Sequence, residues 1–594
     1  MSARESSDRD SGSGIHHNHL IAYLDSRGII ASLNDVTRAL PEYYSSLSNT
    51  YYPKRGPPQI TRVYRVVNMA TRSSMQMRAM IVLPRSALRA LFGAGWRILC
   101  KLPPVPMIPD KYRANMHIDF LYADQKTIIK HILNLWFPCN RASPNVDVLE
   151  RARNESARTF ARSVCLNLRA GYGKTFIAAG MITTLGARAL YVVSTCELAR
   201  QALSDLTLVI PQCGVIYAKS ADLLRRARDA PSLYSVCIVV INTLLLYMNT
   251  LDSVTHRAPR ALAHSFGLVI LDEVHTLCSE TRAQVFWYAQ TRFMFGMSAT
   301  VNERRDGRDF MLEHHLHPLI DAAQIPGFTY GSFPFTVSVR VINYYGPNEF
   351  TRTLKHDTTG MIFVPYMIDQ FARDPARSSV IVHECARLLA REHNVFIFCG
   401  ERAHCEQIAR DLERAHVAST EDKGTTMPRA VIFYSGIDDD DRALAVACNA
   451  QLGQSARVLI ATYGYSGTGV SIVRMTAIIL ASPRYSTMKQ IVGRILRRGS
   501  DTTREREVVD IVDSRTCLAR QFTKRCAAYN YYGATYKKVC ARPIDEGARE
   551  CVYDDENDDD DECPSSDLSL SPSTSMSSRT LIDDFDDDVG TCMP

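Results

Sequence analysis

The feature that most constrains the fold is a regular alternation of short β-branched runs with stretches of helical periodicity. Such alternation is typical of parallel sheets covered by helices, because parallel strands need a crossover connection between them. Two sets of runs are present, so we expect two α/β domains in tandem, with a linker over residues 317–333. The first set is ALYVVS, VCIVVIN, GLVILDE and FMFGMSAT, and the second is NVFIFCG, AVIFYSG, RVLIAT, AIILAS and VVDIVD.

The segments outside the two α/β domains differ from them in composition. Near the start, RVYRVV and RAMIVL predict strands, and PRSALRALFGAGW predicts a short helix after Pro84, which together indicate a small mixed domain. The two ends are too polar to bury a core, so both are predicted to be disordered. The predicted parts are 1–20 (disordered), 21–114 (small mixed domain), 115–330 (first α/β domain), 336–545 (second α/β domain) and 546–594 (acidic tail).

The chain of 594 residues has a net charge of +6, and this charge is unevenly distributed. Residues 551–594 contain fourteen acidic side chains against one arginine, a net of −13, so residues 1–550 carry +19. A basic body favours an anionic partner, and nucleic acid is the commonest one. The acidic tail is expected to be simply solvated, to mimic nucleic acid loosely or to bind a protein partner.

Cysteine usage and apolar runs bear on the compartment. The seventeen cysteines include no Cys-x-x-Cys pair, so the sequence indicates neither a zinc site nor a disulfide framework, and reduced thiols are typical of an intracellular protein. The start, MSARESSDRDSGSG, lacks the apolar core of a signal peptide. The longest apolar run, VCIVVINTLLLYM, is too short to span a bilayer. We therefore expect a soluble intracellular protein with no membrane partner.

The stretch LNLRAGYGKTF, residues 166–176, is a candidate phosphate-binding loop. The full pattern is Gly, four residues, then Gly-Lys-Ser/Thr, and here Leu168 stands at the first glycine. Taken alone, the stretch fits an ordinary loop as well as a nucleotide site. In a nucleotide site, Lys174 would lie against the β- and γ-phosphates of ATP, and Thr175 would bind Mg²⁺. The amides that would cradle the phosphates at the start of a helix belong to Gly171, Tyr172, Gly173, Lys174 and Thr175.

The stretch FGLVILDEVH, residues 266–275, supplies the carboxylates that such a site needs. Its apolar run predicts a buried strand that delivers Asp272 and Glu273 to its carboxyl end, where ligands bind in open parallel sheets. We expect Asp272 to hold Mg²⁺ and Glu273 to polarise the attacking water. The alternative is a strand that ends in two solvated acids, and the nearby Gly-Lys-Thr loop makes that alternative the weaker one.

The stretch QIVGRILRRG, residues 490–499, is predicted to place Gln490, Arg494 and Arg497 on one helix. Arg494 and Arg497 are three residues apart and therefore share a helix face. Two such arginines can neutralise the charge that develops on the γ-phosphate, which is the arginine-finger role. The alternatives are a solvated basic face and a contact with a nucleic-acid backbone.

Taken in order, Gly-Lys-Thr, Asp-Glu-x-His, Ser-Ala-Thr and Gln-x-x-Gly-Arg-x-x-Arg resemble the motifs of superfamily 2 helicases over residues 115–515. Within that range, GMSATVNERRDG (296–307) resembles the signature of the branch that contains XPB, RecG-like enzymes and the poxvirus transcript-release DNA helicases, with Val301 in place of the usual proline. The resemblance implies two tandem RecA-like domains that hydrolyse ATP in the cleft between them. It also implies that ATP and Mg²⁺ are the cofactors.

The same resemblance implies roles for further residues. Gln125, in DQK at 124–126, would read the adenine base. Two positions depart from the branch, because Thr468 and Ser471 stand where it keeps acids, and this departure concerns coupling rather than ATP hydrolysis. The residues that would couple the ATP site to strand movement are His275, Ser298, Thr300, Gly469 and Gln490.

Nucleic acid would lie across both domains, held chiefly through its phosphates. The hydroxyls of Thr195, Thr243 and Thr462 would contact it, although each alone would more often be a strand-end hydroxyl. Phosphate contacts give affinity without sequence preference. The predicted contacts therefore do not by themselves distinguish one nucleic acid from another.

We expect an ATP hydrolase that acts as a helicase or translocase, with DNA favoured over RNA. Two alternatives stay open: an RNA helicase, which differs only in substrate, and a helicase-like clamp or scaffold with little hydrolysis. A degenerate core should have lost at least one catalytic residue, so the intact set argues against the clamp. The compact length, the acidic tail and the resemblance to poxvirus enzymes indicate a large DNA virus as the source.

Overall fold

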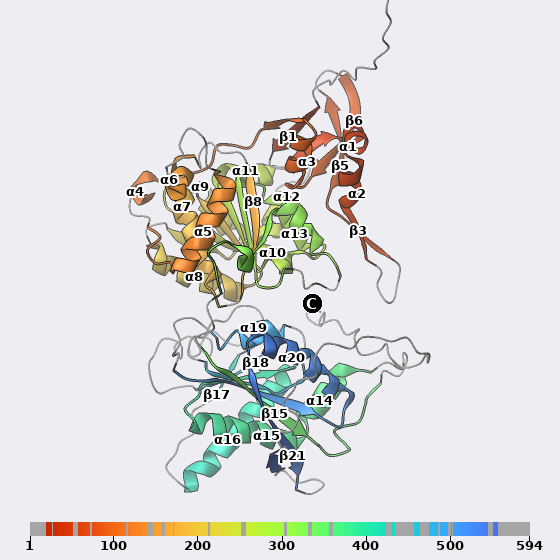
Figure 1. Cartoon of the computed structure of the whole chain (residues 1–594), viewed down its shortest axis with the longest axis vertical. Coiled ribbons are helices and arrows are strands. Elements are labelled where there is room, and N and C mark those ends of the chain that lie inside the picture. The colour runs from red at the N-terminus through yellow and green to blue at the C-terminus, as the bar shows by residue number, and fades with distance from the viewer. Residues whose placement is uncertain are drawn as a thin grey trace, which may run out of the picture. The chain divides into compact units, whose positions relative to one another are not determined.

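The apolar runs of the sequence form the strands of three main sheets, which Figure 1 shows in a computed structural model. The chain divides into two compact units, one of Met1–Leu168 with Thr175–Phe328 and the other of Arg169–Lys174 with Thr329–Pro594. The residues that the structure describes are 20–25, 28–51, 58–71, 74–113, 117–138, 147–155, 161–169, 171–211, 214–250, 257–301, 304, 306–330, 335–355, 360, 362–422, 430–433, 457–463, 475–484, 487–496, 501, 503–544 and 551–555.

The first unit begins with a mixed sheet in the order β5-β6-β2-β1-β7, in which β1 and β7 are parallel and the other pairs are antiparallel. The predicted strands and short helix are present here. A separate two-stranded sheet pairs β3 with β4. The elements are β1 (Ile21–Asp25), β2 (Gly28–Ser32), α1 (Leu33–Ala39), α2 (Pro41–Ser46), β3 (Ser48–Tyr51), β4 (Gln59–Arg62), β5 (Arg65–Thr71), β6 (Ser74–Leu83), α3 (Ala87–Gly93), β7 (Arg97–Cys100) and α4 (Asp110–Arg113).

This small sheet is fastened to the rest of the first unit by Arg85, which is 3% exposed. Its Nε donates to Gln290 Oε1 at 2.9 Å and its Nη1 to the Arg162 carbonyl at 2.9 Å. Burial lowers the pKa of Arg85 to about 9, which still leaves the guanidinium charged at neutral pH. A buried charge is costly unless it is hydrogen-bonded. These bonds therefore hold the small mixed sheet in a fixed position against the rest of the first unit.

The second sheet of the first unit has seven strands, all parallel, in the order β10-β11-β9-β12-β13-β8-β14. Its four central apolar runs are the ones that the sequence predicted. The elements are α5 (Ala123–Trp136), α6 (Val148–Glu155), β8 (Arg162–Asn167), α7 (Lys174–Leu185), β9 (Ala189–Val193), α8 (Cys196–Val209), β10 (Val215–Ala218), α9 (Ala221–Asp229), β11 (Val236–Val240), α10 (Ile241–Thr250), α11 (Arg257–Ser265), β12 (Leu268–Asp272), η2 (Val274–Leu277), η3 (Arg282–Gln284), α12 (Val285–Tyr288), β13 (Phe293–Ser298), α13 (Phe310–His315), β14 (Leu319–Asp321) and η4 (Ala322–Gln324).

The linker predicted at 317–333 begins too early. Strand β14 lies inside it and pairs in parallel with β8, with Leu319 opposite Cys165. The strand has only three residues, which is too short a run to stand out in the sequence. The first unit extends to Phe328.

The second unit contains an eight-stranded sheet in the order β17-β18-β16-β19-β20-β15-β21-β22, parallel except for the antiparallel β22. All five runs of the second predicted set are strands in it. The elements are β15 (Val337–Tyr344), α14 (Val364–Ala372), α15 (Pro375–Ala390), β16 (Val395–Cys399), α16 (Arg402–Asp422), β17 (Ala430–Phe433), β18 (Val458–Thr462), β19 (Ala477–Leu480), α19 (Met488–Val492), β20 (Arg506–Asp513), η5 (Cys517–Arg520), α20 (Gln521–Tyr531), β21 (Thr535–Pro543) and β22 (Cys551–Asp555).

The edge strand β22 lies within the segment that the sequence assigned to the acidic tail from residue 546. It pairs with β21, with Tyr553 opposite Ala541, and the ring of Tyr553 stacks on that of His383. The strand consists of three apolar or aromatic residues followed by two acids. Charged residues are tolerated on an edge strand, so the acidic composition masked the pairing.

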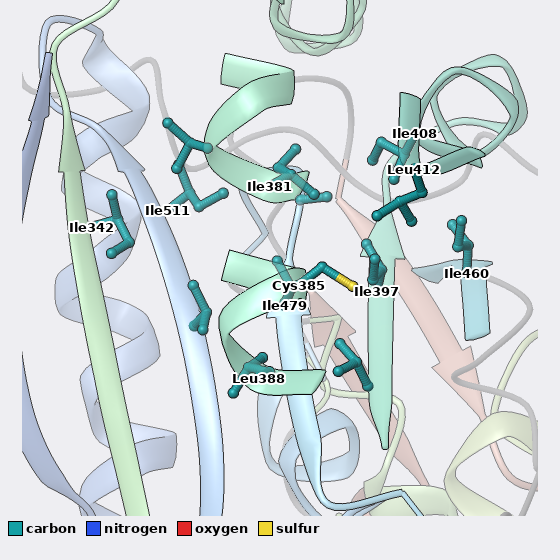
Figure 2. Packing of buried hydrophobic residues seen from close by; sticks show 14 of the residues in the cluster. Ile342, Ile381, Cys385, Leu388, Ile397, Ile408, Leu412, Ile460, Ile479 and Ile511 are labelled. Atoms are coloured by element: carbon teal, nitrogen blue, oxygen red, sulfur yellow. The ribbon is translucent and has the colours of Figure 1, made fainter. Parts of the chain in front are cut away.

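Helices cover both faces of this sheet. Figure 2 shows Ile381, Cys385 and Leu388 of α15 facing strand residues such as Ile397 and Ile479 in one apolar cluster. On the opposite face, α19 and α20 pack through a second cluster, and Figure 1 shows these two helices across the sheet from α15 and α16. The continuous apolar strands of the sequence follow from this two-sided burial.

Two buried ion pairs fix the carboxyl-terminal half of β20. Arg377 donates to both oxygens of Asp513 at 2.7 and 3.1 Å, and also to the Ala481 carbonyl at 2.6 Å. Arg525 donates to both oxygens of Asp510 at 2.8 Å, and the Tyr529 hydroxyl donates to the same carboxylate at 2.6 Å. Each pair is almost fully buried.

No helix in the described ranges has both the length and the apolarity needed to cross a bilayer.

Replacing Arg377 with alanine should lower the free energy of unfolding by about 3–5 kcal/mol, because Asp513 is left as a buried, unpaired charge. A matched control is Arg373→Ala, which removes an exposed pair with Asp369 and should change stability by about 0.5 kcal/mol or less. Urea denaturation followed by circular dichroism compares the two variants. Equal losses would contradict the structural role assigned to the buried pair.

Candidate active site

The predicted functional residues of the first unit gather at one end of its seven-stranded sheet. Because the strands are parallel, their carboxyl ends lie together. Strand β8 leads into the 166–176 loop, and β12 and β13 end at Asp272 and Ser298. Strands β9 and β11 are followed directly by the segments that carry Thr195 and Thr243. The sequence motifs therefore come together through the register of the sheet.

The backbone of the 166–176 loop has the conformation that its glycines permit. Gly171 has φ of 84° and Gly173 has φ of 75°, a region that L-residues with side chains rarely adopt. Lys174 is the first residue of α7, so the preceding amides lie at a helix N-terminus, which favours anions. Leu168 is fully buried and its N–H donates to the Ser298 carbonyl at 2.8 Å. Leu168, at the position that usually holds the first glycine, is therefore part of the hydrophobic core.

Helix α7 is packed closely by α5, the helix that carries Gln125. A Cβ added at Gly180 of α7 would lie 2.4 Å from Ile129 Cδ1 of α5, so the Ile129 side chain would have to shift if Gly180 were replaced. Gln125 is 2% exposed, and its Oε1 accepts the Tyr122 N–H at 3.1 Å in the first turn of α5. The packing places α5, which carries Gln125, against α7. Its adenine-reading role stays a prediction.

Asp272 and Glu273 form the acidic centre of the site. Asp272 is 6% exposed, and its Oδ1 accepts the Glu273 N–H at 2.9 Å. Glu273 has φ of 46° and ψ of 51°, a left-handed conformation that costs about 1–2 kcal/mol for a residue with a Cβ. Such strain concentrates at functional sites, where surrounding contacts hold it. Here the hydrogen bond to Asp272 is one of those contacts.

Tyr191 of β9 is a member of this site that the sequence reasoning missed. Its hydroxyl donates to Asp272 Oδ2 at 3.0 Å. Burial and then the negative Asp272 raise the pKa of Tyr191 well above its ordinary value, so the hydroxyl keeps its proton. The available signal was a single hydroxyl-bearing residue in the apolar strand ALYVV.

His275, Ser298 and Thr300 form a hydrogen-bonded group beside the acidic centre. His275 Nδ1 lies 2.7 Å from Ser298 Oγ and 3.5 Å from Glu273 Oε2. Ser298 is fully buried, and its Oγ accepts the Thr300 N–H at 3.1 Å. Three of the residues predicted to couple ATP hydrolysis to movement are therefore in contact with one another and with Glu273.

The loop after Thr300 is attached to the same group. Arg304 donates to the His275 carbonyl at 3.3 Å and to both oxygens of Asp306, at 2.9 and 2.6 Å. Although burial raises the pKa of Asp306, hydrogen bonds from Arg304 and the Arg308 N–H bring it below its ordinary value. Asp306 therefore stays ionised and keeps Arg304 oriented.

The predicted helix over 490–499 is shorter in the structure. Helix α19 ends at Val492, and Gly493 and Arg494 continue it only as a turn, in which the Arg494 N–H donates to the Ile491 carbonyl at 3.0 Å. Gly493 explains the early end, because glycine is a poor helix former. Gln490 is half-buried on α19 and Arg494 is 8% exposed. Arg497 and Gly469 lie outside the described residues, as do Thr468 and Ser471.

The three predicted phosphate-contacting threonines occupy different settings. Thr195 caps α8, and its Oγ1 accepts the Leu198 N–H at 3.3 Å. Thr243 lies in the first turn of α10 rather than at the end of a strand, and is half-buried. Thr462 is the last residue of β18 in the second unit and is also half-buried. Their contacts with nucleic acid stay predictions.

Comparison with known proteins places this site in a wider group. The family described as "Type III restriction enzyme, res subunit" matches residues 120–303. The chain is 30% identical over 388 residues to "Putative ATP-dependent RNA helicase QP509L" of African swine fever virus (isolate Tick/Malawi/Lil 20-1/1983), which covers 63% of this chain and 70% of that protein. It is 22% identical over 410 residues to "Putative helicase 161L" of Invertebrate iridescent virus 6, covering 66% and 79%.

A solved structure with a similar arrangement of elements is that of Mss116p bound to ssRNA and AMP-PNP. It is 12% identical to this chain, covers 70% of this chain and 77% of its own, and superposes with a TM-score of 0.44.

Replacing Lys174 with alanine should reduce ATP hydrolysis to background while the fold is kept, because the change removes a point charge for the phosphates and leaves the glycine turn intact. The matched control is Lys130→Ala, which alters an exposed lysine on α5. Steady-state phosphate release measures the rate, and circular dichroism measures the fold. Turnover near the wild-type rate in the Lys174 variant would refute the phosphate-loop assignment.

Proposed function

Because the chain belongs to the viral superfamily 2 ATP-dependent helicases, we propose that it couples ATP hydrolysis to movement along DNA. The observation that supports this most directly is the connected set of contacts at the carboxyl end of the seven-stranded sheet. It runs from the Asp272 carboxylate to Glu273, then to His275, and on to Ser298 and Thr300. A site of this kind connects the side chains that bind phosphate to a segment, here Ser298 and Thr300, whose conformation can respond to the state of the nucleotide.

In this proposal the loop before α7 and the carboxyl end of the seven-stranded sheet bind the triphosphate. The amides at the start of α7 and the Lys174 ammonium bind the phosphate oxygens. The donor set fits Mg²⁺, because it offers the Thr175 hydroxyl in the first turn of α7 and the Asp272 carboxylate at the end of β12, and hard cations prefer oxygen ligands. When bound, Mg²⁺ would neutralise negative charge on the β- and γ-phosphates.

Glu273 is the proposed base that orients the attacking water. Its left-handed backbone turns the side chain away from the course of β12, and the side chain is partly exposed. His275 lies 3.5 Å from its carboxylate and 2.7 Å from Ser298. A change in the position of Glu273 on hydrolysis would therefore alter, through His275, the contacts of Ser298. From the sequence, Arg494 and Arg497 stay the proposed arginine fingers.

DNA is the proposed substrate because the stretch GMSATVNERRDG resembles the signature of a branch that contains DNA helicases. Thr195, Thr243 and Thr462 would contact its phosphates, and the basic body of the chain would hold it without sequence preference. RNA is the second candidate, since the African swine fever virus relative is named as a putative RNA helicase. The acidic tail is proposed to bind a protein partner.

The deciding experiment measures ATP hydrolysis with single-stranded DNA, duplex DNA and RNA of the same length and sequence, side by side. Stimulation by DNA that exceeds stimulation by RNA supports the proposal. A preference for RNA moves the chain to the second candidate. ATP hydrolysis that no nucleic acid stimulates would contradict both.

Ser298→Ala should separate hydrolysis from movement, because it removes the hydroxyl that joins His275 to the Thr300 backbone. We expect ATP hydrolysis to stay within a few-fold of wild type while strand displacement per ATP falls about tenfold, the equivalent of losing one hydrogen bond of about 1.4 kcal/mol. Ser163→Ala, which removes a hydroxyl at the start of β8 that donates to the His317 carbonyl, is the matched control. Equal losses of hydrolysis and displacement in the Ser298 variant would count against a coupling role.

Arg494→Ala and Arg497→Ala should each lower kcat by about 10³ or more if both act as fingers. ATP binding should weaken much less, since the charge that they neutralise grows toward the transition state. Arg504→Ala, in the same unit, removes an arginine that pairs with Glu392 and serves as the control. Lost nucleic-acid affinity with kcat preserved would assign the two arginines to backbone binding instead.

A further inference from the structure

Tyr191 reaches the acidic centre from a neighbouring strand. Strands β9 and β12 are parallel neighbours, and Tyr191 is directly opposite Ile270. Side chains two residues apart on a strand share a face, so Tyr191, Ile270 and Asp272 lie on the same face of the sheet. Asp272 is two residues further along, about 6.6 Å at the usual rise of a parallel strand. A tyrosine side chain leaning along the strand is long enough to cover that distance.

The hydrogen bond of the Tyr191 hydroxyl has a fixed direction. An ionised carboxylate only accepts, so the hydroxyl donates its single proton to Asp272 Oδ2, at 3.0 Å. A hydrogen bond to a charged group is about twice as strong as one between neutral groups.

Both oxygens of the Asp272 carboxylate are held by hydrogen bonds. The other oxygen, Oδ1, accepts the Glu273 N–H at 2.9 Å. An ionised carboxylate has about four acceptor sites, so both oxygens keep lone pairs for a cation. Tyr191 of β9 and the backbone that follows β12 thereby fix the orientation of one carboxylate.

We propose that Tyr191 is a positioning residue, whose hydroxyl holds the Asp272 carboxylate in the orientation that binds Mg²⁺ together with the nucleotide. This inference rests on the magnesium site of the proposed function. It assigns a role to a residue of a buried strand, where a ring without a hydroxyl would fill the same space. The other four residues of β9 are apolar and buried.

A merely structural tyrosine would behave differently. A buried hydroxyl needs partners, and satisfying it with backbone carbonyls would stabilise the fold without affecting ligand binding. The hydrogen-bond partner of Tyr191 is instead the Asp272 carboxylate, a side chain that the site uses. Its removal should therefore alter what Mg²⁺ adds to nucleotide affinity, beyond any effect on stability.

The test compares Tyr191→Phe with the wild-type chain in equilibrium binding of N-methylanthraniloyl-ADP, measured by fluorescence with Mg²⁺ and again with EDTA. The readout is the ratio of the two dissociation constants, which isolates the contribution of the metal. We expect Tyr191→Phe to lower the gain in affinity from Mg²⁺ about tenfold, the size expected for one hydrogen bond to a charged group. Binding in EDTA should be unchanged. A gain equal to or larger than that of wild type would overturn the proposal.

Two further variants separate the possible failures. Tyr247→Phe removes another buried tyrosine hydroxyl of the first unit, one that accepts from Arg228 Nη1 at 2.7 Å, and should leave the Mg²⁺ gain at the wild-type value. Asp272→Asn should abolish the gain if the magnesium site itself is correctly assigned. A full gain in Asp272→Asn would refute the magnesium site. Loss in Asp272→Asn with a wild-type gain in Tyr191→Phe would refute only the role of Tyr191.

Discussion

The hydrogen bonds to the buried Asp272 carboxylate are the interactions on which the rest of the site depends. A carboxylate that is 6% exposed is costly to bury unless donors surround it, and here the Tyr191 hydroxyl and the Glu273 N–H supply two of them. The second donor also holds Glu273 in its left-handed conformation. The same carboxylate thus fixes the backbone of Glu273 beside it and the Tyr191 hydroxyl on the neighbouring strand. These contacts are possible only because β9 and β12 are parallel neighbours in register.

The sequence predicted the strands well because burial on both faces leaves a strong signal. Runs such as VCIVV and LVILD are wholly apolar, and both are buried strands of parallel sheets. Short or charged strands escaped this signal. Strand β14 was not predicted because it has only three residues. Strand β22 was not predicted because it lies in the acidic segment near the carboxyl terminus. The spacing of the arginines predicts a helix beyond Val492, but α19 ends there because the next residue is Gly493, a poor helix former.

The sequence predicts those residues of the candidate site that belong to a short local motif. It does not predict residues that join the site through contacts between neighbouring strands. Lys174, Asp272 and Ser298 are found by short patterns, because each pattern sets its own turn. Tyr191 has no such pattern, since its role depends on which strand lies next to β12. The sequence order of strands does not give that neighbour, and only the topology β11-β9-β12-β13 does. For the same reason no local pattern predicts the contact between His275 of η2 and Ser298 at the end of β13.

The contacts of the acidic centre extend beyond the seven-stranded sheet. Arg304 joins the His275 carbonyl to Asp306, and the Gly307 carbonyl in the same loop accepts from Asn49 of β3 at 3.2 Å. Gly307 has φ of 63°, so the loop turns there in a way that favours glycine. A contiguous path of packed polar contacts thus leads from Glu273 to the small N-terminal sheets within one unit. Contiguity alone does not make a path transmit a signal, because a coupled element needs two arrangements that both ends favour differently. The strained Glu273 backbone is the element of this path best suited to that role, since a change of its hydrogen-bond partners would shift the balance between two backbone regions.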